Sequence, residues 1–255
     1  MSVFAKYAGY YDLLYRDKDY SGEVVFVSSL LSQYAPACAT ICDLGCGTGK
    51  HAALLAEMGY TVHGIDLSVE MLEAAQVRVA ALPDEIAGRL RFSAGDVRTC
   101  RLEPTFDAAL ALFHVVSYQV TNEDLIGMFK NVAAHLRSGG VFICDYWYGP
   151  AVLSEMPAVR VKHMESDAIA VVRVAEPVLN ADQSLVEVNY RISVRDKATG
   201  VTDELRETHR MRYLFDGDME WLARTSGLRL LDSFEWLTMK KPGSDTWSVC
   251  SIFAK

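Results

Sequence analysis

The chain has no excess of positive charge. Its 255 residues include 25 Lys and Arg against 33 Asp and Glu, which gives a formal net charge of −8 at pH 7, and no Lys/Arg cluster interrupts this balance. Proteins that bind nucleic acid need basic surface, because much of their affinity comes from neutralising phosphates. The composition therefore argues against a nucleic-acid partner.

Cysteine patterns typical of metal sites or redox pairs are also absent. The six cysteines contain no C-x-x-C pair, and several fall in apolar runs where a thiol is a small apolar side chain; they stand at positions 38, 42, 46, 100, 144 and 250. We find neither a signal peptide nor an apolar run of about 18 residues. We therefore expect a cytoplasmic protein with no metal and no membrane contact.

Internal repeats and low-complexity tracts are missing as well. A chain of 255 residues can bury a sizeable core. Its length fits one α/β domain with an insertion, or two small domains.

The most informative segment present is ICDLGCGTGKHAALLAEMGYTVHGID, residues 41–66. An apolar strand leads into Gly45, Gly47 and Gly49, which predict a tight turn whose backbone approaches a ligand that any Cβ would block. A helix is predicted over 50–58 and a second strand over 60–65. The segment is therefore expected to form a βαβ unit with a ligand at its turn.

Asp66 stands at the end of the second strand of this unit. A carboxylate there can accept hydrogen bonds from both hydroxyls of a ribose, and each such bond is worth roughly 1.5 to 3 kcal/mol when desolvated. The sequence therefore predicts an adenosine-like ligand.

The glycine spacing and the nearby charge indicate which ligand it is. A dinucleotide-binding turn has the pattern G-x-G-x-x-G, whose third glycine lets the helix pack beside a pyrophosphate. Lys50 occupies that third position here, and Asp43 precedes the glycines. Asp43 would repel a pyrophosphate, but it suits the ammonium and sulfonium groups of S-adenosylmethionine. A nicotinamide oxidoreductase is the rival interpretation, and the charge favours the sulfonium cofactor.

With its D-x-G-x-G-x-G turn followed by Asp66, the chain resembles the class I S-adenosylmethionine-dependent methyltransferases. In RFSAGDV, the resemblance implies that the Asp96 side chain faces the adenine amino group and that the Val97 amide meets a ring nitrogen. FDAALALFH, residues 106–114, is an apolar run typical of a central parallel strand, and it ends at Phe113 and His114, beside the expected methyl donor. HLRSGGVFICDYW, residues 135–147, predicts a helix end, a glycine turn and a buried strand that stops at Asp145.

The remaining segments predict how the fold is completed. The first 35 residues indicate helices that, by the resemblance, cap the cofactor; further helices are predicted over 68–82, with Ser68 as N-cap, and over 122–136. From 158 to 215, apolar and charged residues alternate, which predicts an antiparallel β meander. A helix, Gly227 and two strands follow.

We therefore predict an α/β fold: a Rossmann-like class I methyltransferase sheet, parallel with an antiparallel last strand, plus the inserted meander. Residues 1–150 and 216–255 are expected to form the cofactor-binding domain with its N-terminal helical cap. Residues 151–215 are expected to form an insertion that contacts the substrate or a second subunit.

A narrower resemblance is carried by Y-D-x-x-Y at 11–15 and K-D-Y at 18–20, together with the meander. These features resemble bacterial methyltransferases of nucleotide-linked (dTDP) deoxyamino sugars, with related enzymes acting on sugar hydroxyls. The resemblance implies in-line methyl transfer to the amine of a small-molecule substrate. Two alternatives stay open: an O-methyltransferase of a sugar or other small-molecule hydroxyl, and a noncatalytic cofactor-binding protein.

The chemistry of methyl transfer indicates the candidate catalytic residues. Holding the nucleophile in line with the methyl carbon can supply roughly 7 to 11 kcal/mol of the barrier. For an amine, a nearby His, Tyr or carboxylate can accept the proton, directly or through water, whereas a hydroxyl nucleophile requires a base. His114, Tyr118 and Asp145 follow central strands, and Tyr11 can reach in from the cap. The alternative interpretations are a loop-orienting histidine, a packing tyrosine and a turn-capping aspartate.

We expect the cofactor to contact Asp43, Gly45, Gly47, Gly49, Asp66, Leu67, Met71, Asp96, Val97, Phe113, Tyr15 and Arg16. Arg16 can meet the cofactor carboxylate, although a solvated surface charge is its ordinary interpretation. An exposed meander edge can pair with a second copy in a homodimer, and capping of that edge by a loop fits the sequence equally well.

Overall fold

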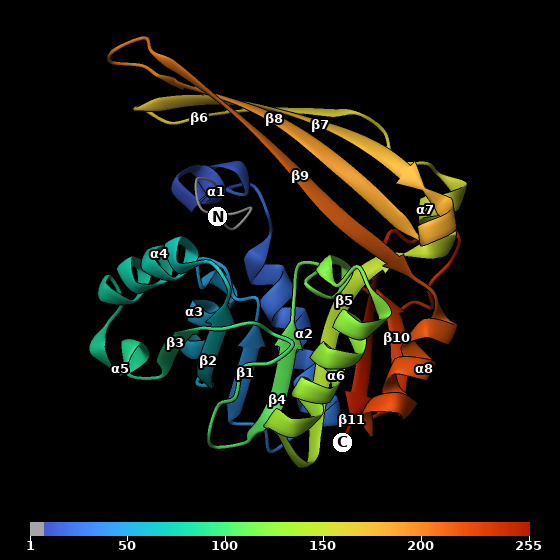
Figure 1. Ribbon diagram of the computed structural model, residues 1–255. Helices are drawn as coiled ribbons and strands as arrows, with labels where there is room; N and C mark the ends of the chain where they lie inside the picture. The colour runs from blue at the N-terminus through green and yellow to red at the C-terminus, as the bar shows by residue number, and fades with distance from the viewer. Residues whose placement is uncertain (1–7) are drawn as a thin grey trace.

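One mixed β-sheet runs through the whole molecule (Figure 1). The computed structural model describes residues 8–255. Within them the strand order is β3-β2-β1-β4-β5-β9-β8-β7-β6, and β11 pairs with both β5 and β10. The strands are β1 (Thr40–Leu44), β2 (Thr61–Asp66), β3 (Leu90–Ala94), β4 (Phe106–Ala111), β5 (Leu136–Tyr148), β6 (Arg160–Glu165), β7 (Ile169–Asn180), β8 (Leu185–Asp196), β9 (Thr202–Leu214), β10 (Arg229–Glu235) and β11 (Ser248–Ala254).

Strands β1 to β5 pair in parallel, and β11 lies antiparallel to β5 and to β10. Every residue of β4 is buried, as expected of a central strand covered on both faces. The predicted class I methyltransferase sheet with an antiparallel last strand is confirmed.

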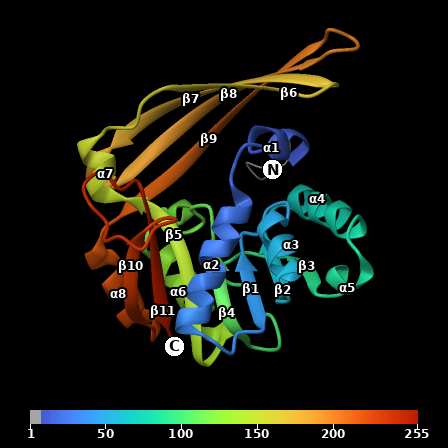
Figure 2. The same ribbon diagram turned by 180° about the vertical axis from the view of Figure 1, so that it is seen from behind.

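Helices cover both faces of this part of the sheet. Side chains of α2 and α3 pack in one hydrophobic cluster, and those of α6 and α8 pack in another on the opposite face (Figures 1 and 2). The helices are α1 (Ala8–Leu14), α2 (Tyr20–Tyr34), α3 (Lys50–Glu57), α4 (Val69–Ala80), α5 (Asp84–Ala87), α6 (Asn122–His135), α7 (Gly149–Ser154) and α8 (Asp216–Ser226), with short 3-10 helices η1 (Val116–Tyr118) and η2 (Ala181–Gln183).

Local sequence signals account for several helix ends. The Ser68 hydroxyl accepts a hydrogen bond from the Met71 backbone N–H, as predicted for the N-cap of α4. Thr121 caps α6 in the same way through the Asp124 N–H. At the C-terminal end of α8, Gly227 adopts a φ of 74°, the left-handed conformation that terminates a helix.

Two strand ends differ from the prediction. β5 does not stop at Asp145: it continues to Tyr148, because Tyr146 and Trp147 still pair with β11, and Trp147 and Tyr148 pair with β9. The glycines expected to form a turn before β5 instead make an irregularity inside it, where the register with β4 shifts. β4 ends at Ala111, three residues early.

The four strands β6 to β9 form the predicted antiparallel meander. It arches over the carboxyl ends of the parallel strands, and α1 lies between it and α4 (Figures 1 and 2). Its inward face packs in two clusters, one of which includes residues of α1. Among residues 8–255, no helix has the length and apolar character needed to cross a membrane.

Candidate active site

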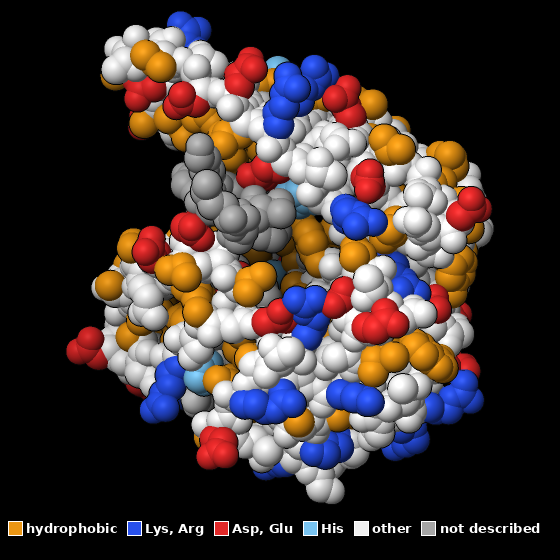
Figure 3. All heavy atoms as spheres, in the orientation of Figure 1, with side chains coloured by type: hydrophobic (Ala, Val, Ile, Leu, Met, Phe, Trp, Pro, Cys, Tyr) orange, Lys and Arg blue, Asp and Glu red, His pale blue; other side chains and the backbone are white. Residues whose placement is uncertain are grey.

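A cavity of about 800 Å³ lies between the carboxyl ends of the parallel strands and the meander. The surface is hollowed at this place, and hydrophobic side chains border the hollow (Figure 3). Open α/β sheets bind ligands at this edge. All predicted site residues line the cavity except Asp43, Gly49, Asp145 and Arg16.

The glycine turn and Asp66 form one end of the cavity. The Asp66 carboxylate accepts hydrogen bonds from the Gly47 backbone N–H at 2.8 Å and from the Ser68 N–H at 2.9 Å. Burial raises the pKa of Asp66, and these two N–H donors oppose the rise. The carboxylate is thereby held at the cavity wall, beside Leu67, whose exposed fraction is 65%.

Gly45 and Gly47 of the turn are required to be glycine for different structural reasons. Gly45 has a φ of 72°, and a Cβ there would lie 2.6 Å from a methyl carbon of Val115. Gly47 has a φ of 54°, and a Cβ there would meet no atom of the described residues within 4 Å. The backbone at Gly47 therefore borders open space in the cavity, which is the room that a ligand needs for close approach.

Asp43 lies beneath this turn. Its side chain is 2% exposed, and its Oδ2 has no hydrogen-bond partner among residues 8–255. Burial raises the pKa of Asp43 to about 6. A buried carboxylate with an unsatisfied oxygen is stabilised by a nearby cation. Together with Asp66, it gives this end of the cavity the charge that suits a sulfonium and an ammonium, so the residues present fit S-adenosylmethionine.

Asp96 lies at the same end but has a partner that the sequence interpretation missed. The Arg98 guanidinium donates to both Asp96 oxygens, with Nε 2.9 Å from Oδ1, and also pairs with Asp124. The Arg98 hydrogen bonds lower the pKa of Asp96. Each carboxylate oxygen has a further lone pair, so the expected adenine contact of Asp96 stays a prediction.

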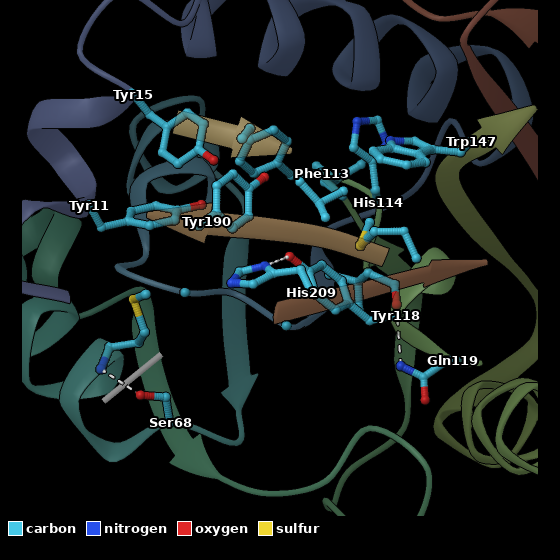
Figure 4. A pocket seen from close by; sticks show the side chains of 18 of the residues that line it. Tyr11, Tyr15, Ser68, Phe113, His114, Tyr118, Gln119, Trp147, Tyr190 and His209 are labelled. Carbon is cyan, nitrogen blue, oxygen red and sulfur yellow. Dashed lines mark hydrogen bonds between the residues drawn. The ribbon is translucent and has the colours of Figure 1, made fainter. Parts of the chain in front are cut away.

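Phe113 and His114 follow β4 in an unusual backbone conformation. Both have a φ of 65°, a left-handed conformation that costs of order 1 kcal/mol or more for non-glycine residues. The surrounding structure holds them there: the His114 N–H donates to the Asp145 carboxylate at 3.1 Å, and His114 Nδ1 lies 2.6 Å from Asp145 Oδ2. Asp145 itself does not line the cavity, whereas His114 does, next to Phe113 and Trp147 (Figure 4).

Helix α1 closes one side of the cavity through Tyr11 and Tyr15. The Tyr15 ring packs edge-on against Phe113 at 5.0 Å, and its hydroxyl accepts a hydrogen bond from Arg173 of the meander at 3.0 Å. Arg16 lies elsewhere: its side chain is 59% exposed, and its Nη1 donates to the Glu165 carbonyl. Arg16 therefore does not line the cavity in which the cofactor is expected.

The meander contributes cavity residues that the sequence interpretation did not select. Arg173, Tyr190 and His209 lie on its inward face, from β7, β8 and β9, and Arg160 of β6 also lines the cavity. The period-two pattern contained the signal, because each of the three stands at an inward position among apolar residues. A polar side chain on a face that covers a binding sheet is a candidate ligand contact.

Known proteins resemble the chain along most of its length. The family described as "Methyltransferase domain" matches residues 41–140. A dTDP-3-amino-3,4,6-trideoxy-alpha-D-glucopyranose N,N-dimethyltransferase from Streptomyces venezuelae is 30% identical over 227 residues, 88% of this chain and 90% of that protein.

Two solved structures are similar in fold. An S-adenosylmethionine-dependent methyltransferase from Clostridium acetobutylicum superposes with a TM-score of 0.81 at 25% identity, covering 98% of each chain. DesVI from Streptomyces venezuelae has a TM-score of 0.78 at 25% identity, covering 97% of this chain and 98% of its own. The chain therefore belongs to the class I S-adenosylmethionine-dependent methyltransferases, and within them it resembles the N,N-dimethyltransferases of nucleotide-linked amino sugars.

Proposed function

We propose that this methyltransferase transfers a methyl group from S-adenosylmethionine to the amine of a nucleotide-linked deoxyamino sugar. The observation that carries the proposal is the charge distribution in one cavity. Asp66 and Asp96 lie at the end that suits the cationic cofactor, whereas Arg160 and Arg173 lie at the meander end. Guanidinium groups bind phosphate oxygens in a bidentate manner, so the meander end suits a nucleoside diphosphate.

The named relative supports the same substrate class, because its name states a dTDP-linked amino sugar and dimethylation of its nitrogen. The cavity volume of about 800 Å³ is in the range of small-molecule and cofactor sites. Trp147 and Trp247 add flat apolar surface to its wall, on which a base or a sugar face can pack.

We assign the proton-accepting role to His114. When bound, S-adenosylmethionine supplies an electrophilic methyl group with a neutral thioether as leaving group. The amine must present its lone pair, so a proton has to leave it, and His114 lies in the cavity wall with Asp145 2.6 Å from its Nδ1. The carboxylate at this distance stabilises the imidazolium that results when His114 takes the proton.

This assignment leads to separate roles for the two parts of the chain. We propose that residues 1–150 and 216–255 bind the cofactor and present His114, and that residues 151–215 bind the nucleotide sugar. We also propose a homodimer, because β6 pairs only with β7 among the described residues and Val161 on it is 54% exposed. Sedimentation velocity tests this: a monomer at micromolar concentration would contradict the homodimer.

A second candidate function is O-methylation of a sugar hydroxyl. The contact between His114 and Asp145 favours it, because a hydroxyl nucleophile needs a true general base, whereas an ammonium group gives up its proton more readily than a hydroxyl does.

Turnover on matched substrates decides between the two functions. Purified protein is incubated with S-adenosylmethionine and either dTDP-3-amino-3,4,6-trideoxy-α-D-glucopyranose or its 3-hydroxy counterpart, and mass spectrometry counts the methyl groups added. We expect methylation of the amine and little of the hydroxyl compound. Methylation of the hydroxyl compound alone would establish the second function, and turnover of neither would remove this substrate class.

A further inference from the structure

Three side chains form a hydrogen-bonded row that joins the meander to the loop after β4. The Tyr118 hydroxyl oxygen of η1 lies 2.7 Å from Nδ1 of His209, and Nε2 of His209 lies 3.3 Å from Oε2 of Glu207. Tyr118 and His209 both line the cavity (Figure 4), while Glu207 stands two residues before His209 on the same face of β9. Each histidine nitrogen therefore has one polar contact along the row.

The row has a defined direction. A carboxylate only accepts hydrogen bonds, so Glu207 places the ring proton of a neutral His209 on Nε2. Nδ1 is then an acceptor, and the Tyr118 hydroxyl donates to it. A phenol that donates its only proton in this way can still accept a hydrogen bond through its oxygen. Through His209, Glu207 thus makes the Tyr118 oxygen a hydrogen-bond acceptor toward a ligand.

The surroundings hold these groups in place. His209 is 4% exposed, and the Tyr190 ring packs edge-on against it with ring centres 4.8 Å apart. Burial raises the pKa of Tyr118 well above its usual value, so its hydroxyl keeps its proton. The Tyr118 oxygen is therefore a neutral, oriented group rather than a mobile one.

We propose that Glu207 and His209 are positioning residues for methyl transfer: they orient the Tyr118 hydroxyl so that its oxygen accepts a hydrogen bond from the N–H of the acceptor amine. This inference rests on the function proposed above. An N–H held in this way fixes the direction of the nitrogen lone pair relative to the methyl carbon.

The hydrogen bond also strengthens as the reaction proceeds. The amine lone pair forms the new N–C bond while the C–S electron pair returns to sulfur, so positive charge develops on nitrogen and its N–H becomes a better donor. An interaction that is stronger in the transition state raises kcat. Primary and secondary amines both keep an N–H before transfer, so the same contact serves a first and a second methylation, and a tertiary amine product has lost it.

A double-mutant cycle tests the inference. We compare His209→Gln, Tyr118→Phe and the double variant, with dTDP-3-amino-3,4,6-trideoxy-α-D-glucopyranose as substrate or, if the parent does not methylate it, with another amine that the parent methylates. If His209 acts through Tyr118, each single change lowers kcat by about tenfold or more, with the cofactor Kd within about twofold of the parent. In the Tyr118→Phe background, His209→Gln then lowers kcat by less than about twofold further.

Conservative variants separate positioning from a general structural role. His209→Asn keeps a carboxamide near the place of Nδ1, so it should retain more turnover than His209→Gln, whose amide lies near the place of Nε2. Glu207→Gln should lower kcat without changing the cofactor Kd, and it replaces His209→Gln in the cycle if the latter does not fold. His163→Gln on β6, an exposed residue that does not line the cavity, is the matched control.

Two outcomes would overturn the inference. One is an equal loss from His209→Gln in both backgrounds, which would make His209 independent of Tyr118; the other is an unchanged kcat in both His209→Gln and Glu207→Gln. Because the cycle is measured on any acceptor that the parent enzyme methylates, its failure is distinct from failure of the proposed amino-sugar substrate.

Discussion

Asp145 holds both the side chain and the backbone of His114. Its Oδ2 lies 2.6 Å from His114 Nδ1, and its carboxylate accepts the His114 backbone N–H at 3.1 Å. One buried carboxylate therefore keeps His114 in a left-handed conformation and directs its ring. In this strained conformation the His114 ring lies in the cavity wall.

We expect His114→Ala to lower kcat by roughly a hundredfold, since loss of a general base typically costs that much or more, with the cofactor Kd unchanged. Asp145→Asn should lower kcat by about tenfold, because an uncharged amide stabilises the imidazolium less. Steady-state kinetics and calorimetry with S-adenosylhomocysteine measure these effects. His163→Ala on the outer face of β6 is the control, and an unchanged kcat in His114→Ala would assign His114 to loop orientation alone.

Asp66→Ala should weaken cofactor binding by at least about tenfold, or about 1.4 kcal/mol. The variant loses the expected ribose acceptor, and it also loses the acceptor of the Gly47 and Ser68 N–H groups that shape the turn. Asp66→Asn keeps one oxygen acceptor and should bind with intermediate affinity. Asp167→Ala, in an exposed turn of the meander, should bind as the parent does. An unchanged Kd in Asp66→Ala would remove Asp66 from the cofactor site.

Asp43 should make the stability of the cofactor-free protein depend on pH. Its pKa is raised to about 6 in the folded protein, against about 4 in the unfolded chain. The folded state therefore binds the proton more tightly, so ionising Asp43 costs folding free energy as pH rises from about 4 to about 6, and that cost persists at neutral pH. From this shift the cost is on the order of 3 kcal/mol.

Asp43→Asn removes this cost, so the variant should be more stable than the parent at neutral pH and similar to it near pH 4. Urea unfolding of both proteins without cofactor, across that pH interval, measures the difference. A stability gap that does not change with pH would mean that Asp43 is already ionised at low cost. The same variant should bind S-adenosylmethionine more weakly, because a charge that favours the sulfonium is gone.

Arg160 offers a test of the meander end of the cavity. Arg160→Gln should raise KM for the nucleotide sugar by about tenfold, since a charge-assisted hydrogen bond to a phosphate contributes on the order of 1.5 kcal/mol or more, while the cofactor Kd stays the same. Arg195→Gln, on an exposed stretch of β8 outside the cavity lining, is the matched control. An equal KM in the parent and in Arg160→Gln would place the phosphates elsewhere.

The amino-acid sequence by itself determined the βαβ unit at residues 41–66, the segments that form the parallel strands, and the negative charge at the cofactor end of the cavity. These features follow from local causes. The glycines permit positive φ, and apolar runs specify buried strands. Asp43 and Asp66 stand near the ends of their strands, and that position does not depend on how the strands pack. Period-two alternation likewise predicted the meander, because the alternation of side chains across a strand is a local property.

Only the tertiary structure decided which side chains meet. Tyr118 and His209 are 91 residues apart, and nothing local relates η1 to β9; the extension of β5 to Tyr148 brings β9 beside it. The ion pair of Arg98 with Asp124, 26 residues further along the chain, and the placement of Arg16 outside the cavity depend in the same way on long-range packing. Sequence patterns specify which side chains share a face of a helix or strand, whereas contacts between helices and strands depend on how the whole chain packs.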